Sequence, residues 1–283
     1  MKILIIGNGY IGNRCLEAWP DAILIDQIIN TKEEVLELLE KYQPDAVFNA
    51  AGITGSPNVD WCETNQAVTV LGNTVLPILL ATACLEKDIY LLHIGSGCVF
   101  YGDSPNPFGW HEDDFANPSA VYTRAKYAAD LALITLPNVG IGRIRMPIDS
   151  TPGSRNLIDK LANYPKIIDV KNSVTVVEDM IKAFRGLIEK KASGIFHVVN
   201  PGHISHKEIM ALYKEYVNPT HSNEWISEEE LVELGLAKKK RSNNIMQSNN
   251  LEKIGLPMRP IKEALRDTMI KYAKNKNKSS LNN

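Results

Sequence analysis

Several features that define other classes of protein are scarce in this 283-residue sequence. Its four cysteines, Cys15, Cys62, Cys84 and Cys98, do not have the spacing of metal ligands. We therefore expect no metal, and cysteines that are reduced as they are in the cytoplasm. Charge of one sign is also missing, because 31 basic and 33 acidic residues give a net charge of −2. This balance gives no reason to expect nucleic acid or an acidic membrane surface as a partner.

Long apolar runs are absent as well. Every apolar stretch is interrupted by polar residues, and no signal peptide precedes the first stretch at Lys2. We therefore expect no membrane span and a cytoplasmic location. The one basic cluster, Lys238 to Arg241, is typical of a solvated helix end or loop. Residues 274–283 are rich in Lys, Asn and Ser, and we expect them to form a disordered tail.

Short apolar runs alternate with helical patterns in the first half of the chain. The runs have the length and β-branched content of buried strands, and they lie at residues 2–6, 22–25, 46–49, 90–94 and 139–145. Helical patterns separate them, at residues 10–19, 31–42, 65–87 and 120–136. This alternation predicts an α/β fold of the Rossmann type, with a doubly wound parallel sheet covered by helices on both faces.

The pattern changes near Pro147, where shorter helices and strands begin. We expect residues 1–147 to form a dinucleotide-binding domain. Residues 148–273 are expected to form mainly a smaller, C-terminal substrate-binding lobe, with a return of the chain to the sheet near residues 194–199 as an alternative.

A glycine motif follows the first expected strand and opens a helix. Its residues are Gly7, Asn8, Gly9, Tyr10, Ile11 and Gly12. In a GxGxxG motif the first glycine allows a tight turn, the second lets the backbone approach a pyrophosphate, and the third lets the helix pack closely on the strand. The pyrophosphate then lies at the helix N-terminus, so the motif predicts a dinucleotide site.

The choice between the two nicotinamide cofactors depends on Asp26, which ends the second strand. A carboxylate there accepts a hydrogen bond from a ribose 2′-OH and repels a 2′-phosphate, which favours NADH. Arg14, in the first helix, would weaken that repulsion, so the expected cofactor is NADPH or NADH. The third strand is followed by residues small enough to let a cofactor lie over the sheet edge, namely Asn49, Ala50, Ala51 and Gly52.

A catalytic group is predicted from three further residues. Tyr122 and Lys126 are four residues apart, so on a helix they project from the same face. A lysine ammonium beside a tyrosine favours the phenolate and can also bind the nicotinamide ribose. Ser96 ends the preceding strand. Together the three side chains would polarise a carbonyl group and give it a proton as hydride arrives.

These residues resemble the extended short-chain dehydrogenase/reductases, and longer stretches resemble the nucleotide-rhamnose epimerase/reductases within that family. The stretches are residues 49–55, 57–63, 97–100, 143–147, 200–202 and 241–244. A looser resemblance extends to dTDP-4-dehydrorhamnose reductase and GDP-fucose synthase. The resemblance implies an enzyme that epimerises UDP-4-keto-6-deoxyglucose at carbons 3 and 5 and then reduces the 4-ketone to give UDP-rhamnose. It also implies a homodimer, because the apolar helices at 65–87 and 120–136 commonly pair with those of a second subunit in this family.

The resemblance gives Cys98 a role. Hydrogens next to a ketone are acidic, and inverting such a centre needs a base on one face and an acid on the other. A thiol, with a pKa of about 8.5, suits this task. Cys98 lies two residues beyond Ser96, as an acid/base cysteine does in GDP-fucose synthase. Lys166 occupies a matching position in the epimerase/reductases and is the expected partner, although an ordinary surface lysine is the alternative.

The remaining candidates would hold the nucleotide and diphosphate of a 4-keto-6-deoxy sugar, and they are Thr54, Asn58, Trp61, Arg155, Asn156 and Arg241. Three functions stay open at this point. The first is a bifunctional 3,5-epimerase/4-reductase, and the second is a dTDP-4-dehydrorhamnose reductase without epimerase activity, which would not need Cys98. The third is a non-catalytic dinucleotide-binding subunit, against which the intact Ser96, Tyr122 and Lys126 argue.

Overall fold

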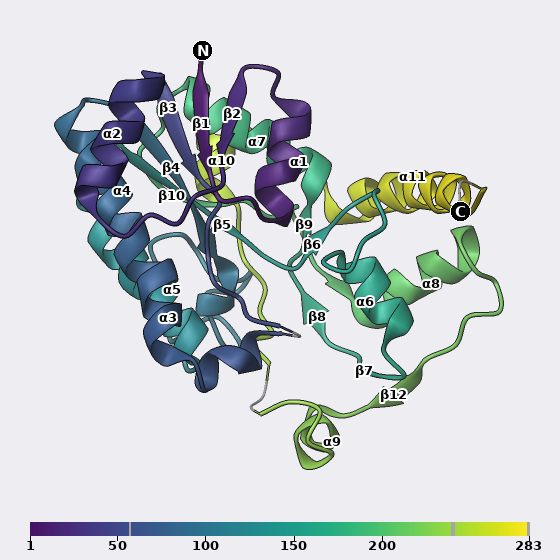
Figure 1. The fold of residues 1–283 in the computed structure, drawn as a ribbon. Coiled ribbons are helices and arrows are strands. Elements are labelled where there is room, and N and C mark those ends of the chain that lie inside the picture. The colour runs from purple at the N-terminus through teal and green to yellow at the C-terminus, as the bar shows by residue number, and fades with distance from the viewer. Residues whose placement is uncertain (57, 239–240, 282–283) are drawn as a thin grey trace. The chain divides into compact units, whose positions relative to one another are not determined.

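The computed structural model of the protein describes residues 1–56, 58–238 and 241–281 (Figure 1). The chain forms two compact units, which are described one at a time. Unit 1 comprises Met1–Val99, Phe115–Arg143 and Ala183–Phe196. Unit 2 comprises the described residues of Phe100–Asp114, Ile144–Lys182 and His197–Asn283.

Unit 1 is built on a six-stranded sheet with the order β10-β5-β4-β3-β1-β2. The strands are β1 (Ile3–Ile6), β2 (Ala22–Ile25), β3 (Ala46–Asn49), β4 (Tyr90–Ser96), β5 (Val139–Ile144) and β10 (Gly194–His197). β1 pairs in parallel with β2 and with β3, and β3 pairs in parallel with β4. All residues of β1, β3 and β4 are buried, which is typical of parallel strands covered on both faces.

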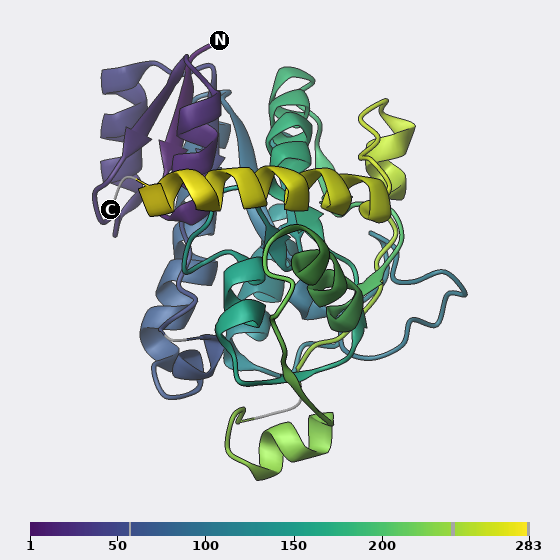
Figure 2. The same cartoon turned by 90° about the vertical axis from the view of Figure 1, so that its right-hand side faces the viewer.

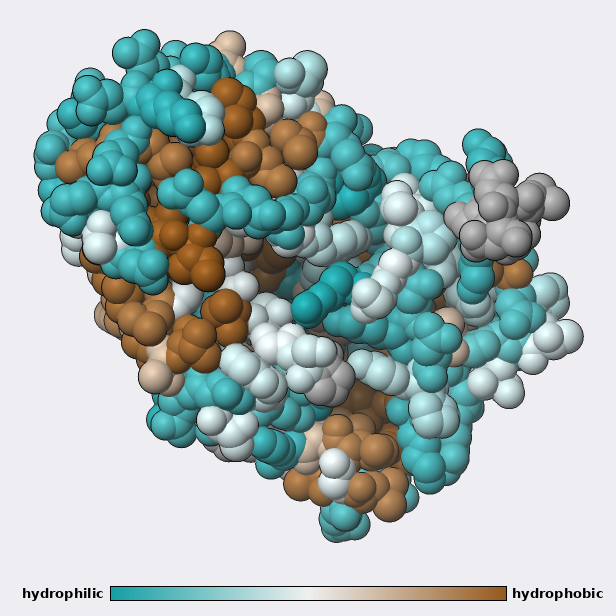
Figure 3. Space-filling model, in the orientation of Figure 1, coloured by the Kyte–Doolittle hydropathy of each residue, from teal (hydrophilic) through white to brown (hydrophobic). Residues whose placement is uncertain are grey.

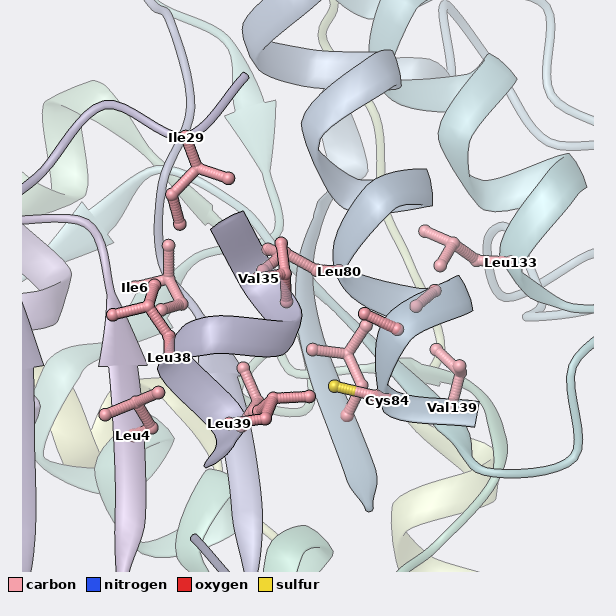
Figure 4. Close-up of a cluster of buried hydrophobic side chains, with 14 of the residues drawn as sticks. Leu4, Ile6, Ile29, Val35, Leu38, Leu39, Leu80, Cys84, Leu133 and Val139 are labelled. Atoms are coloured by element: carbon pink, nitrogen blue, oxygen red, sulfur yellow. The ribbon is translucent and has the colours of Figure 1, made fainter. Parts of the chain in front are cut away.

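Helices cover both faces of this sheet. The helices of unit 1 are α1 (Tyr10–Ala18), α2 (Lys32–Tyr42), α3 (Gln66–Val70), α4 (Leu76–Glu86), α5 (Val121–Leu133) and part of α7 (Val177–Glu189). On one face, Leu4 and Ile6 of β1 pack with Leu38 of α2 and Leu80 of α4 (Figure 4). On the other face, Phe48 of β3 contacts the rings of Trp19 and Phe184. The predicted doubly wound, Rossmann-type fold is therefore confirmed.

The apolar helix expected at 65–87 is a helical run with a π-helical segment, η2 (Leu71–Val75), between α3 and α4. Within the described residues this run, Gln66–Glu86, is long and apolar enough to cross a membrane by length and composition alone. This differs from the expectation that every apolar stretch is too interrupted to span a membrane. A core helix passes the same test, and the fully buried Leu80 and Cys84 show that α4 packs in the core of unit 1.

Unit 2 has three small sheets of two strands each, formed by β6 (Pro147–Ile148) with β9 (Thr175–Val176), β7 (Lys166–Ile168) with β12 (Glu224–Ile226), and β8 (Lys171–Asn172) with β11 (Ile204–Ser205). Its helices are the start of α7, α6 (Leu157–Asn163), α8 (His206–Tyr216), α9 (Glu228–Glu233), α10 (Asn249–Lys253) and α11 (Ile261–Leu281). Figure 2 shows α6 and α8 next to the long α11, and their apolar faces form a second core that includes Ile158, Ile209 and Leu265.

The expected domain boundaries differ from the observed units in four places, the first of which is that residues 144–147 belong to unit 2. Residues 100–114 belong to unit 2, and residues 183–196 return to unit 1, where β10 joins the sheet as the alternative had it. Residues 274–281 are helical, so a disordered tail from 274 onward is wrong for that stretch. The side chain of Asn275 donates to the Ser150 carbonyl at 3.0 Å, and Lys276 donates to the Tyr213 hydroxyl at 2.8 Å. These contacts bind the C-terminal part of α11 to the rest of unit 2. Residues 282–283, and part of the basic cluster at 238–241, lie outside the described residues.

Candidate active site

The glycine motif has the geometry that a pyrophosphate site needs. Gly7 has φ +111°, and a Cβ there would lie 2.5 Å from the Ala51 nitrogen. A Cβ on Gly12 would lie 2.2 Å from the Gly7 carbonyl oxygen, so close packing demands both glycines. A Cβ on Gly9 would have no described atom within 4 Å, so the backbone is open to a ligand there. The N-cap residue of α1 is Gly9, which has no side chain to cap the helix, and a helix N-terminus attracts an anion.

Asp26 is exposed directly after β2 and is held toward the glycine motif. The side-chain amide of Asn8 donates to an Asp26 carboxylate oxygen at 2.9 Å, and Asn13 donates to the Asn8 amide oxygen at 2.8 Å. Arg14 forms an ion pair with Glu17 on the same helix. Its charge is therefore engaged by a carboxylate on α1, which limits how far it can offset Asp26.

The fold brings Ser96, Tyr122 and Lys126 together. Ser96 ends β4, and its hydroxyl is hydrogen-bonded to the Tyr122 phenol. Lys126, one turn further along α5, donates from Nζ to the Ile94 carbonyl at 2.8 Å. A Cβ on Gly52 would lie 3.5 Å from Nζ of Lys126, so the small residues after β3 border the lysine. The predicted trio is thus one structural site.

Burial controls the protonation of this trio. It raises the pKa of the Tyr122 phenol, and the nearby Cys98 thiol group adds to that effect, while the Ser96 hydrogen bond opposes it. Burial also lowers the pKa of Lys126 to about 8, against the effect of Asp130. Tyr122 is therefore a neutral phenol, which is the form that can donate a proton to a ketone oxygen.

Cys98 lies at the same site, in the short 3-10 helix η3 (Gly97–Val99). It is half-buried, its backbone N–H donates to the Ser96 hydroxyl at 3.2 Å, and its thiol is close enough to influence the Tyr122 pKa. The other cysteines are fully buried, and burial raises the pKa of Cys84 to about 12. Cys98 is therefore the cysteine with both access and polar neighbours. Among the described residues no cluster of His, Cys, Asp or Glu could hold a metal ion.

The structure adds buried polar residues to the site, and apart from Asn49, which was predicted to border the cofactor, the sequence analysis did not single them out. Asn49 and His93 share a hydrogen bond of 3.0 Å, and Asn73 of η2 donates to the Ile53 carbonyl at 2.9 Å and accepts from the Ile53 N–H at 3.1 Å. Asp130 and Arg143 form a buried ion pair. One signal in the sequence was available, since Asp130 continues the four-residue spacing of Tyr122 and Lys126.

The unit 1 candidates for substrate contact occupy the loop between β3 and α3. Trp61 packs on Gly55, where a Cβ would lie 2.6 Å from the Trp61 Cβ. Asn58 caps the 3-10 helix η1 (Val59–Glu63) by accepting from the Asp60 N–H at 2.8 Å. Thr54 is half-buried in the same loop. Asn58 therefore shapes the loop with its amide oxygen.

The unit 2 candidates are held in different ways. Lys166 is half-exposed and forms an ion pair with Glu224 at 2.8 Å. Arg155 is exposed and Arg241 is half-buried. Asn156 is fully buried as the N-cap of α6, and its amide bonds the backbone of residues 149, 151 and 158. Direct contact of Asn156 with a substrate is therefore a wrong expectation, because its polar atoms are already used.

Two family-like stretches of the sequence meet inside unit 2. Arg145 is buried and donates to the side-chain oxygen of Asn172 and to the carbonyl of Ser242. The Asn244 N–H donates to the same Asn172 oxygen at 3.0 Å, and its side chain donates to the Phe100 carbonyl at 2.8 Å. The loop that follows the basic cluster is therefore fixed by a buried polar network.

A pocket of unit 2 is lined by residues that include Asp169, Lys171, His203, Glu208 and Lys262. Its lining contains no residue of the glycine motif or of the Ser96 trio.

Comparison with known proteins gives a consistent result. The model of the RmlD substrate binding domain family matches residues 1–274. The chain is 33% identical over 243 residues to the bifunctional dTDP-4-dehydrorhamnose 3,5-epimerase/dTDP-4-dehydrorhamnose reductase of Arabidopsis thaliana, which covers 84% of this chain and 80% of that protein. Trifunctional rhamnose enzymes of the same plant match over only 36% to 43% of their length.

Solved structures agree with the observed fold. The L780 UDP-rhamnose synthase of Acanthamoeba polyphaga mimivirus superposes with a TM-score of 0.89 at 29% identity, covering 96% of this chain and 99% of that one. A dTDP-4-dehydrorhamnose reductase of Bacillus anthracis, in complex with NADP, has a TM-score of 0.83 at 24% identity over 95% of this chain and 99% of that one. The family match over nearly the whole chain, together with the assembled Ser96, Tyr122 and Lys126, shows that this chain is an enzyme of the RmlD substrate-binding-domain family.

Proposed function

We propose that the chain is a bifunctional 3,5-epimerase/4-reductase that converts UDP-4-keto-6-deoxyglucose into UDP-rhamnose with NADPH or NADH. The observation that carries the proposal is the position of Cys98, which is hydrogen-bonded to Ser96 and lies beside Tyr122. A carbon acid/base and a ketone-protonating trio therefore share one site. The bifunctional plant enzyme and the viral UDP-rhamnose synthase support the same assignment.

The reduction uses the trio and the glycine motif. The N-terminus of α1 would hold the cofactor pyrophosphate and Asp26 the ribose, and the bound nicotinamide supplies the hydride. Ser96 orients the 4-ketone through its hydroxyl. Tyr122 donates its phenolic proton to the ketone oxygen, which becomes the 4-hydroxyl group. Lys126, as an ammonium, stabilises the phenolate that remains.

The epimerisation uses the same ketone. The Cys98 thiolate removes the proton from carbon 3 or carbon 5, and the electron pair of the broken C–H bond forms an enolate. Hydrogen bonds from Ser96 and Tyr122 stabilise the negative oxygen of that enolate. A second acid then protonates the carbon on the opposite face, which inverts the centre. We propose Lys166 as this acid, and its pairing with Glu224 is consistent with a charged ammonium that can donate a proton.

A reductase without epimerase activity is the second candidate. One observation favours it: the side chain of Lys166, the proposed second acid, is half-exposed and paired with the Glu224 carboxylate, so no described contact directs it toward a sugar carbon. Such an enzyme would accept dTDP-4-dehydrorhamnose that another protein had already epimerised.

We further propose a cytoplasmic homodimer. Large apolar side chains remain exposed on α3, η2, α4 and α5, and they are Val68, Val70, Leu71, Leu85 and Leu131. Brown, apolar surface lies over this side of unit 1 in Figure 3. A second copy of the chain would cover it, because contiguous exposed apolar patches mark interaction surfaces. Light scattering at micromolar concentration should give twice the chain mass, and a monomeric mass would refute the dimer.

One experiment tests the function. The protein is incubated with UDP- or dTDP-4-keto-6-deoxyglucose and with NADH or NADPH, and the products are identified by NMR. We expect UDP-rhamnose from the UDP sugar. Production of the non-epimerised 4-reduced sugar, or activity only on a pre-epimerised ketone, would replace the bifunctional enzyme by the simple reductase.

A further inference from the structure

Three buried charged residues, Lys126, Asp130 and Arg143, lie next to the catalytic tyrosine or to one another. Lys126 and Asp130 follow Tyr122 at four-residue intervals on α5, so the three side chains share one helix face. Lys126 is 4% exposed and Asp130 is 1% exposed. Arg143 of β5, 1% exposed, donates from Nε to Asp130 at 2.8 Å. The reduction uses Tyr122 and Lys126, but nothing in it yet accounts for the other two charges.

The fold makes room for this pair. Gly95 of β4 faces it, and a Cβ there would lie 2.9 Å from the Arg143 Cγ and 3.3 Å from an Asp130 carboxylate oxygen. That same oxygen, Oδ1, is buried and has no hydrogen-bond partner among the described residues. A buried ion pair is weak evidence for stability, because apolar residues of similar volume often replace it without loss. The pair therefore calls for an explanation other than stability.

Electrostatics supplies one. Burial lowers the pKa of Lys126 to about 8, and the negative charge of Asp130 acts in the opposite direction. Burial also raises the pKa of Asp130, while the adjacent Arg143 guanidinium favours its ionised form. Each of these charges thus supports the charge of the next one, from Arg143 to Asp130 to Lys126.

Other groups around Lys126 do not replace Asp130. His93 of β4 is fully buried, and burial together with the Lys126 charge lowers its pKa, so it is neutral. The segment η2 contributes the neutral amide of Asn73 and the hydroxyl of Thr74, which donates to the Ala125 carbonyl. The remaining titratable groups on the elements packed against α5 are Asp60, Cys62 and Glu63 of η1, Cys84 and Glu86 of α4, Tyr90 of β4 and Cys98 of η3; α5 itself adds Tyr122, Arg124 and Tyr127.

Most of these groups are thiols or phenols. Glu63 accepts from the Val121 N–H at the start of α5, and Glu86 pairs with Lys32 on the surface. Among the carboxylates, Asp130 is the one whose charge raises the Lys126 pKa.

We propose that Asp130 and Arg143 are positioning residues that keep the Lys126 ammonium charged at neutral pH, so that Tyr122 can complete each proton transfer. The proposal concerns how the protein maintains a charge and not which sugar it binds. It rests on the proposed function only in that Lys126 assists Tyr122.

The direction of the effect follows from the charges. Asp130→Asn removes the negative charge next to Lys126 and leaves Arg143 as a buried positive charge, and both changes favour neutral lysine. The Lys126 pKa should fall by at least about one unit, the usual size of such an interaction. The basic limb of the kcat/KM profile should move to lower pH by the same amount. At pH 8 the protonated fraction would fall from about a half to about a tenth, so kcat/KM should fall about fivefold.

The primary measurement is the titration of Lys126 itself, by NMR of protein labelled with ¹³C at the lysine Cε. The resonance is assigned by its absence from Lys126→Arg. We expect the Asp130→Asn protein to titrate at least about one unit lower than the wild type, and Asp130→Glu, which keeps the charge, to restore most of the shift. Asp179→Asn is the control, because Asp179 is a buried aspartate of unit 2 that pairs with an arginine, Arg259, at 2.9 Å. It should leave Lys126 unchanged.

A second variant separates charge from stability. Asp130→Asn with Arg143→Leu removes the unpaired buried cation, so the melting temperature should recover. The Lys126 titration should stay below that of the wild type, although above that of Asp130→Asn alone. Equal titration of Lys126 in the wild type and in both Asp130→Asn proteins would overturn the proposal and leave a structural ion pair. If the titration shifts but no nucleotide sugar is turned over, the proposed function fails and this inference stands.

Discussion

Two lysines were predicted to act in the same enzyme, and the fold holds them in opposite ways. Lys126 lies on a helix, is 4% exposed, and donates to a backbone carbonyl at 2.8 Å. Lys166 begins a three-residue strand, and its side chain is 35% exposed and paired with a surface glutamate. Burial lowers the pKa of Lys126. Lys166 lies where solvent screens most interactions between charges.

This contrast shows that the fold changes the pKa of a functional residue mainly where that residue is buried. A buried lysine needs compensating groups, so its neighbours become part of its chemistry, as Asp130 and Arg143 do. A half-exposed lysine such as Lys166 has fewer protein neighbours, so its position depends more on the substrate. We therefore expect substitutions in the buried group to have large effects on turnover, and substitutions of exposed candidates to have small ones.

The largest effect is expected at Tyr122. Tyr122→Phe removes the proton donor and keeps the ring, so turnover should fall by a factor on the order of 10² to 10⁴, the usual scale for a lost general acid. Cofactor binding, measured by fluorescence titration, should be nearly intact. Tyr127→Phe is the control on the same helix, because the Tyr127 hydroxyl only accepts from the Ala116 N–H at 3.2 Å. Near-normal turnover by Tyr122→Phe would remove Tyr122 from the mechanism.

The next effect separates epimerisation from reduction. In D₂O without reduced cofactor, the wild type should introduce deuterium at carbons 3 and 5 of the 4-keto sugar, because this step needs only the enolate. Cys98→Ser has nearly the same shape but is a much weaker acid, so exchange should fall by a factor on the order of 10² at one or both carbons. Reduction of a pre-epimerised 4-keto-rhamnose nucleotide should be retained.

Cys84→Ala serves as the cysteine control, because Cys84 lies in the core of unit 1 away from the polar site. It should lower stability and leave both reactions in place. Absence of deuterium uptake by the wild type with either nucleotide would contradict the bifunctional assignment.

Tyr122 was found in the sequence because local spacing determines its placement, whereas the role of Cys98 came from the resemblance to a known family. Strand ends, the glycine motif and the i,i+4 spacing on α5 are local patterns, and the structure has all of them. The pair of Asp130 and Arg143 joins a helix to a strand 13 residues away, and no periodicity reports such a contact. The π-helical segment η2 was missed for a similar reason, because an inserted residue leaves an apolar helix apolar.

Domain boundaries were also beyond local patterns. Residues 100–114 follow a strand of unit 1 but belong to unit 2, where Trp110 stacks on Phe100 with ring centroids 4.7 Å apart. The helix α11 continues through a Lys- and Asn-rich stretch because tertiary contacts hold it. Composition predicted disorder there since it does not report what a segment packs against.

A smaller effect is expected at the exposed lysine. Lys166→Met removes the proposed second acid, and exchange at the carbon it serves should fall by roughly tenfold, below the scale of a buried general acid. Turnover of pre-epimerised substrate should be unchanged. Lys207→Met is the matched control, because Lys207 is also a surface lysine of unit 2 with a carboxylate partner, Asp169, at 3.4 Å. Equal loss in both variants would mean that Lys166 has no special role.

The smallest effect concerns the cofactor, where the relevant charge, that of Asp26, is exposed to solvent. Asp26 is held by Asn8 at 2.9 Å, which directs its carboxylate toward the glycine motif, and Arg14 is paired with Glu17. A ribose 2′-phosphate would meet this carboxylate, so NADH should be used at least as well as NADPH. Interactions between exposed charges contribute only about 0–1 kcal/mol. Asp26→Asn should therefore raise kcat/KM with NADPH relative to NADH by no more than about fivefold, while Arg14→Ala should leave the ratio nearly unchanged, because Glu17 already engages that guanidinium. Binding of 2′,5′-ADP and of 5′-AMP to the free protein gives the same comparison without turnover. A large NADPH preference in the wild type that disappears in Arg14→Ala would show that the arginine outweighs Asp26, and that exposure alone does not decide how strongly a charge acts in this site.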